Sequence, residues 1–94
     1  MRTEIVARHL DISEKTREYI HREIEHRLGA QYDRIVDCKM IVEKDNKDYI
    51  AEVIANVPGE QLTATERSDG LTKSIDFVVK KMQRQISKHK DKWK

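Results

Sequence analysis

The chain has 94 residues, 37% of them hydrophobic and 38% charged, with three glycines, one proline and a formal net charge of +2. This length fits one domain, residues 1–94, and excludes a second independent core, while the composition excludes a disordered tail. The sequence has neither the ~20 consecutive apolar residues of a membrane span nor a signal peptide at its start, and a single Cys38 suits a reducing compartment, so we expect a cytoplasmic protein with no membrane partner.

A strand followed by a helix is predicted at the start of the chain. Residues 3–8 form a short extended run, and Ser13 is the expected N-cap of the helix after it. One face of that helix holds Thr16, Tyr19, Ile20, Ile24 and Leu28. Gly29 is expected to end the helix just past its last turn.

Three further strands are predicted between residues 34 and 66. Residues 34–44 and 49–57 alternate with period two, and residues 61–66 form a shorter run. The apolar face of the first of these strands holds Val36, Cys38, Met40 and Val42. Turns are expected at residues 45–47 and at Pro58-Gly59.

The last predicted element is a helix capped by Asp69. Its apolar positions are Leu71, Ile75, Val78, Val79, Met82 and Ile86, spaced by three and four residues. The element order is therefore β-α-β-β-β-α. Because the first helix is a crossover, we predict an α+β fold whose four-stranded mixed sheet pairs the first two strands in parallel, with two helices packed on one face.

Charge is distributed very unevenly along the chain. From residue 80 to the end, seven basic residues accompany one acidic residue, a net charge of +6, whereas the rest of the chain sums to −4. On the last helix, Lys73, Lys80 and Arg84 lie within about 40° of each other, with Lys88 close by. An ordinary solvated helix end explains two or three of these lysines, but not six net charges. The pattern therefore favours a nucleic-acid phosphate backbone as the partner.

A second, weaker basic line is predicted on the first helix. Lys15, Arg22 and His26 form it, and Glu18 and Glu25 interrupt it. Beside the last helix it would form the other wall of a positive groove.

The sequence predicts no catalytic site, no metal site, no cofactor and no small-molecule substrate. His21 and His26 are five residues apart, not the four that would align two metal ligands on a helix, and Cys38 alternates with core residues of a strand. An enzyme is therefore not expected. The sheet lacks the aromatic strands of an RRM, and the basic residues lie at the opposite end of the last helix from those of double-stranded RNA-binding domains.

Five segments, in order along nearly the whole chain, resemble the ribosome hibernation promoting factor family, which includes the ribosome-associated inhibitor A proteins. They are Ile12-Ser13-Glu14, Arg17-Glu18-Tyr19-Ile20, Tyr32-Asp33-Arg34-Ile35, Ser74-Ile75-Asp76 and Arg84-Gln85-Ile86-Ser87-Lys88-His89-Lys90-Asp91-Lys92.

The resemblance implies a ribosome-binding domain that lodges in the decoding region of the small ribosomal subunit. There it would hold ribosomal RNA, exclude mRNA and tRNA, and inhibit translation during stress or stationary phase. By position, the resemblance implies that the rRNA-binding residues are Arg22, Arg27, Lys81, Arg84, Lys88, Lys90 and Lys92. Lys80 joins them from its helical spacing alone.

Several alternatives stay open at this point. The chain is either a short family member or the N-terminal domain of a long one, and short members include both promoters and antagonists of ribosome dimers. Trp93 either stacks on a base or makes an ordinary packing contact. A general double-stranded RNA-binding module, or a protein-interaction domain that docks an acidic partner, is the alternative function.

Overall fold

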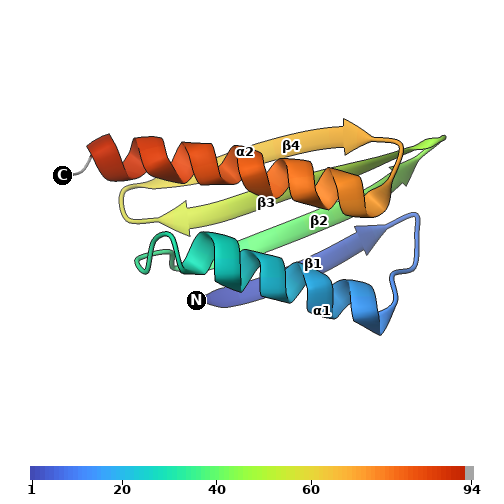
Figure 1. Ribbon diagram of the computed structural model, residues 1–94, viewed down its shortest axis with the longest axis horizontal. Coiled ribbons are helices and arrows are strands. Elements are labelled where there is room, and N and C mark those ends of the chain that lie inside the picture. Colours follow the sequence, from blue (N-terminus) through green and yellow to red (C-terminus); the bar gives the residue numbers. More distant parts are fainter. Residues whose placement is uncertain (93–94) are drawn as a thin grey trace.

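The computed structural model describes residues 1–92 and contains four strands, two α-helices and one π-helical turn (Figure 1). The elements in chain order are β1 (Arg2–Arg8), α1 (Glu14–Glu23), η1 (Ile24–Gly29), β2 (Asp37–Asp45), β3 (Asp48–Val57), β4 (Glu60–Ser68) and α2 (Leu71–Lys92). This order confirms the predicted β-α-β-β-β-α arrangement.

The four strands form one mixed sheet in the order β1-β2-β3-β4. β1 pairs with β2 in parallel, so that Ile5 lies opposite Met40, and the other two pairs are antiparallel. Each hairpin turns at a residue in the left-handed region, with a φ of 57° at Asn46 and 87° at Gly59. The parallel first pair follows from the crossover through α1, as predicted.

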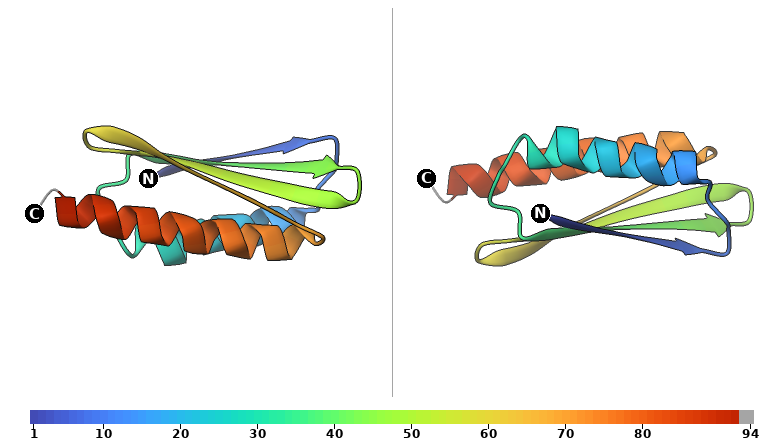
Figure 2. Two further views of the ribbon diagram at one scale, coloured as in Figure 1. Left: turned by 90° about the horizontal axis from the view of Figure 1, so that it is seen from above. Right: turned by 90° about the horizontal axis from the view of Figure 1, so that it is seen from below.

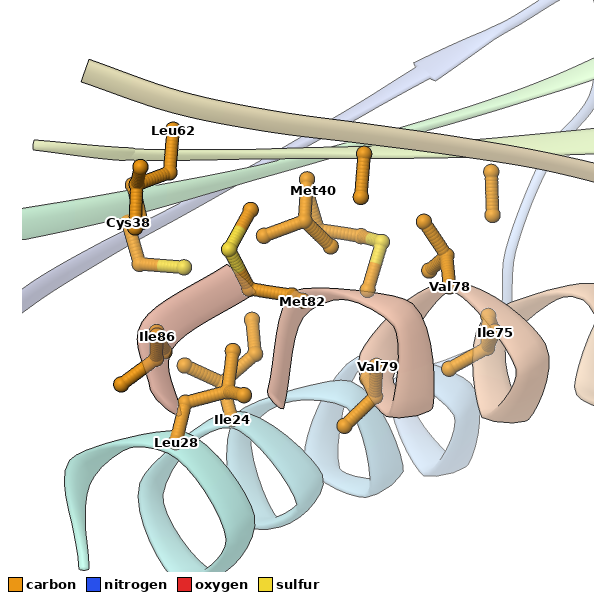
Figure 3. Close-up of a cluster of buried hydrophobic side chains, with 14 of the residues drawn as sticks. Ile24, Leu28, Cys38, Met40, Leu62, Ile75, Val78, Val79, Met82 and Ile86 are labelled. Carbon is orange, nitrogen blue, oxygen red and sulfur yellow. The ribbon is translucent and has the colours of Figure 1, made fainter. Parts of the chain in front are cut away.

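Both helices cover the same face of the sheet, which leaves the other face open (Figure 2). The core lies between these two layers (Figure 3). Its fully buried large side chains include Ile20, Ile24, Leu28, Met40, Ile75, Val78, Val79, Met82 and Ile86. The α+β class and the packing of both helices on one face are therefore confirmed.

The first helix begins as predicted and ends differently. Ser13 caps it by accepting a hydrogen bond from the Thr16 N–H at 3.1 Å. The helix then widens into η1, where the Ala30 N–H donates to the Glu25 carbonyl five residues earlier. Helical structure ends at Gly29, as predicted, but Gly29 is the last residue of the π-helical turn and does not adopt the left-handed conformation of a glycine that follows a helix.

Two local predictions are wrong. β2 begins at Asp37, and Val36 lies outside the strand with 62% of its surface exposed, although its N–H donates to the Asn56 carbonyl at 2.8 Å. Gly70, and not Asp69, precedes the first residue of α2, and its carbonyl accepts the Ser74 N–H. The Asp69 carboxylate instead accepts a hydrogen bond from Lys73 at 2.9 Å.

Within residues 1–92, no helix is long and apolar enough to cross a membrane.

Candidate nucleic-acid interface

The side of α2 that faces away from the sheet carries a row of cations. This cationic face consists of Lys73, Lys80, Lys81, Arg84, Lys88 and Lys92. At 100° per residue these side chains span about 120° of the helix, and the buried residues Ile75, Val79, Met82 and Ile86 lie on the opposite side. The same periodicity that directs the apolar residues onto the sheet therefore leaves the cations on the outer half of the helix, with Lys81 and Lys92 at its edge beside β4.

Arg84 and Lys88 are the least restrained cations of this face. Both are exposed, and within residues 1–92 neither forms a hydrogen bond or an ion pair. Arg84 lies between two surface hollows of about 480 and 370 Å³. The first hollow also reaches Lys88 and Lys92 beside β4, and the second lies between the helices, beside Gln31 and Ser87. An approaching anion can therefore meet the Arg84 guanidinium without first displacing a carboxylate.

Lys80, Lys81 and Lys92 have weak partners inside the protein. Lys80 lies 3.2 Å from Asp76, and Lys92 lies 3.9 Å from Glu60. Lys81 donates to the Thr65 carbonyl at 3.1 Å. Roughly half or more of each lysine side chain is exposed, and exposed ion pairs of this kind contribute at most about 1 kcal/mol, so phosphates can replace these partners.

Arg27 has a different environment from the other predicted RNA contacts. Its guanidinium donates to Glu23 and to Asp76, each at 2.8 Å, and to Gln83 at 3.2 Å. Burial alone would lower the pKa of Arg27, but the hydrogen bonds to the two carboxylates raise it overall. The same contact with Arg27 is the main cause that lowers the pKa of Asp76. Arg27 therefore joins η1 to α2, and its role as an RNA contact stays a prediction.

Gln31 and Lys90 reinforce the junction between the two helical segments. The Gln31 side chain donates to the Gln83 carbonyl at 2.9 Å and to Ser87 at 3.0 Å. Lys90 donates to the Gln31 carbonyl at 2.9 Å and is exposed. These contacts fix the spacing of the helices near the end of α2 where most of the cations lie.

The predicted basic line of α1 remains at the surface. Lys15, Arg22 and His26 are all exposed, and Arg22 lies on the side of α1 opposite the buried Ile20 and Ile24. Within residues 1–92, Arg22 forms no ion pair or hydrogen bond. Since both helices lie on one face of the sheet (Figure 2), the outward sides of α1 and α2 face the same side of the molecule.

His89 is a positioning residue that the sequence pattern did not single out. Only 2% of its surface is exposed, and its Nδ1 lies 2.5 Å from Glu60 Oε2. Its ring also meets Tyr32 edge-on, with the centroids 5.5 Å apart. His89 follows Met82 by seven residues and Ile86 by three, and this helical spacing could have predicted that it lies on the buried side of α2. His89 thereby holds the last turns of α2, with Lys88 and Lys92, against the start of β4.

Cys38 and Met82 are buried, as predicted. Met82 is fully buried and Cys38 is 1% exposed. Burial, followed by the neighbouring Asp37 charge, raises the pKa of the Cys38 thiol to about 12, which keeps it protonated. Trp93, the candidate stacking residue, lies outside the described residues.

The chain is similar to several characterised proteins along nearly its whole length. A ribosome hibernation promoting factor from Escherichia coli (strain K12) is 26% identical over 94 residues, which cover 100% of this chain and 98% of that protein. A protein of the same name from Azotobacter vinelandii is 28% identical and covers 98% of this chain and 85% of its own length.

Two solved structures share the fold. A ribosomal subunit interface protein from Coxiella burnetii superimposes with a TM-score of 0.90 at 26% identity, over 97% of this chain and 99% of that one. The N-terminal domain of Thermus thermophilus Protein Y gives a TM-score of 0.86 at 23% identity, over 95% of this chain and 99% of that domain.

The family model described as Sigma 54 modulation protein / S30EA ribosomal protein matches residues 3–94, nearly the whole chain. This match, with relatives named as ribosome hibernation promoting factors, confirms the resemblance seen in the sequence. The chain therefore belongs to the Sigma 54 modulation protein / S30EA ribosomal protein family.

Proposed function

We propose that this protein is a ribosome hibernation factor that binds ribosomal RNA in the decoding region of the small subunit through the outward side of α2. In that position it blocks mRNA and tRNA and inhibits translation when cells stop growing. The observation that carries the proposal is the cationic face of α2, where Arg84 and Lys88 are exposed and unpaired. The family to which the chain belongs supports a ribosomal partner.

The chemistry of the face suits a phosphate backbone. Each cation that replaces a counterion on RNA contributes a salt-dependent share of the binding free energy. If about five cations of the face each contact a phosphate, the logarithm of the binding constant should fall with the logarithm of salt concentration at a slope of roughly −3.5 to −4.5. Phosphate contacts carry little sequence information, so the shape of the two-helix layer selects the site.

Rigidity is the second requirement of this function. Arg27, Gln31 and Gln83 join the helices through direct hydrogen bonds, and His89 holds the end of α2 on the sheet. A surface that is already ordered loses little conformational entropy on binding. We assign Arg84 and Lys88 to direct phosphate contacts, and Arg22, Lys80, Lys81, Lys90 and Lys92 to the surrounding contacts. Arg27 acts mainly by holding the helices at their spacing.

The protein acts by occupying space, without catalysis, and its place of action is the cytoplasm, where ribosomes translate. Relatives of similar length are named as promoters of hibernation. Whether this chain also drives ribosomes into dimers is an outcome to be measured with the same material.

Co-sedimentation of the purified chain with isolated small and large subunits tests the proposal. We expect stoichiometric binding to the small subunit alone, lost in the presence of mRNA with tRNA and weakened by salt. Equal binding to any long RNA duplex would instead identify a general double-stranded RNA-binding module. Binding that survives ribonuclease treatment would identify a protein partner. Sucrose-gradient profiles of intact ribosomes report dimers in parallel.

A further inference from the structure

Phe77 is an aromatic side chain in the middle of the cationic face. It is the only phenylalanine of the chain, and 40% of its surface is exposed. At 100° per residue it lies at the centre of the arc that runs from Lys80 to Lys92, about 150° from the middle of the buried stripe. Helical periodicity predicts a polar residue at such a position. Packing against the sheet therefore does not explain the phenylalanine.

Within residues 1–92 the ring of Phe77 takes part in no aromatic pair and no cation–π contact. The aromatic contacts of the described chain are the Tyr32–His89 pair and the ammonium of Lys44 over Tyr49. Phe77 takes part in neither, although Lys73, Lys80 and Lys81 are each within one helical turn of it. With 40% of the residue exposed and no cation stacked on its ring, Phe77 is accessible to a partner from outside.

The positions of the surrounding cations indicate what that partner is. Lys73 lies about 6 Å before Phe77 along the helix axis, Lys81 about 6 Å after it and Arg84 about 10.5 Å after it. A ring set among cations at these spacings suits an RNA strand, because phosphates follow one another along its backbone while flat bases project from it. If the partner were an apolar protein surface, the same cations would lose their bound water and gain no phosphate in its place, which would be unfavourable.

We propose that Phe77 stacks on an unpaired nucleobase of the RNA that the cationic face binds. The assignment rests on the proposed function and adds to it a contact that does not depend on charge. The flanking lysines bind the RNA backbone on both sides of the ring. The ring then stacks on one base that is not stacked on its neighbours in the RNA. The contact favours single-stranded or bulged RNA over a continuous duplex, because bases in a duplex do not expose their faces.

The test compares Phe77→Ala, Phe77→Leu and Phe77→Tyr in co-sedimentation with small subunits across a salt titration. Leu keeps apolar volume and helix propensity but lacks the ring, whereas Tyr keeps the ring. We expect Ala and Leu to weaken binding by roughly 5- to 100-fold, the range that loss of one base–aromatic stack produces, and Tyr to bind within about threefold of wild type. The salt slope should stay unchanged in all three variants, since the ring carries no charge. Val36→Ala, an exposed apolar residue in the loop before β2, is the control and should bind as wild type does.

A photoreactive phenylalanine analogue at position 77 identifies the partner directly. A cross-link to ribosomal RNA supports the proposal, and a cross-link to a ribosomal protein overturns it. Binding of the Ala variant equal to wild type, or full binding of the Leu variant, also overturns it while leaving the proposed function intact. If the wild-type chain does not bind small subunits at all, the proposed function fails and this assignment fails with it.

Discussion

Neutralising Arg84 and Lys88 together should remove the two phosphate contacts that we propose for them, without disturbing the fold. Both side chains are exposed and have no partner within residues 1–92, so Arg84→Gln with Lys88→Gln should change the free energy of unfolding by less than about 0.5 kcal/mol. Each lost phosphate contact makes the slope of the logarithm of the binding constant against the logarithm of salt concentration shallower by about 0.7–0.9. The slope of the double variant should therefore be shallower than that of wild type by about 1.4–1.8. If the two binding curves meet near 1 M salt, this corresponds to roughly 25- to 60-fold weaker binding at 0.1 M.

The assay is co-sedimentation with small subunits at four or five salt concentrations, with circular dichroism and urea unfolding to verify the fold. Lys39→Gln with Lys47→Gln is the matched control, because it gives the same net charge. Lys47 lies in the β2–β3 turn, and Lys39 lies on the sheet face that the helices leave open. The control should keep the wild-type slope. A double variant at Arg84 and Lys88 that keeps the wild-type slope would refute the assignment of these residues to phosphates.

Three further predictions concern the fold that holds the interface. Arg27→Met leaves Glu23 and Asp76 without their shared cation and should lower the free energy of unfolding by about 1 kcal/mol in urea titrations at pH 7. Arg27 lowers the pKa of Asp76 below its usual 3.8 in the folded protein. The stability that this ion pair contributes is therefore present above pH 3.8 and is lost as the pH falls through the lower folded pKa. The unfolding free energies of wild type and variant should become equal in acid. Cys38, with a pKa of about 12 and almost no exposure, should react with iodoacetamide at pH 8 roughly 100-fold or more slowly than in urea, and equal rates would contradict its burial. Gly29→Ala places a Cβ 3.2 Å from the flexible tip of Met1, which can move aside. The alanine should stabilise the protein by about 0.4–1 kcal/mol in thermal unfolding, because it reduces the conformational entropy of the unfolded chain. A loss of stability would show that the π-helical turn requires glycine.

Most of the fold follows from periodicity because one sheet face and one side of each helix are buried. Cys38, Met40 and Val42 alternate inward along β2, and Ile75, Val79 and Met82 recur along α2, so the layers could be predicted without any long-range information. Ser13 could also be predicted, because an N-cap depends only on residues three positions away.

The local predictions that are wrong involve choices that tertiary contacts decide. Helical structure does end at Gly29, but through the π-helical turn η1 and not through a left-handed glycine, and this brings Gln31 within reach of α2. Asp69 is a good cap by residue type, yet it pairs with Lys73 while Gly70 takes the cap position. Alternation extended to Val36 fails because the regular register begins at Asp37: Val36 bonds through its backbone to Arg2 and Asn56, but its side chain is exposed.

The sequence could predict which cations share the cationic face, but not which carboxylates and carbonyls they contact. Spacing alone placed Lys80, Arg84 and Lys88 together on one side of a helix. It could not show that Arg27 binds two carboxylates from different elements, since Asp76 is far from it in sequence. For the same reason the His89–Glu60 contact, between the end of α2 and the start of β4, became visible only in the fold.

Tethered hydroxyl-radical cleavage tests the central claim most directly, because it reports which ribosomal RNA lies beside α2. An iron chelate is attached to Ser87→Cys, next to Arg84, and in a second protein to Lys47→Cys in the β2–β3 turn; the buried Cys38 should not take the label. We expect strong cleavage of small-subunit RNA in the decoding region from position 87 and little or none from position 47. Cleavage mainly from position 47, or cleavage of large-subunit RNA, would contradict the proposal that the outward side of α2 binds the decoding region.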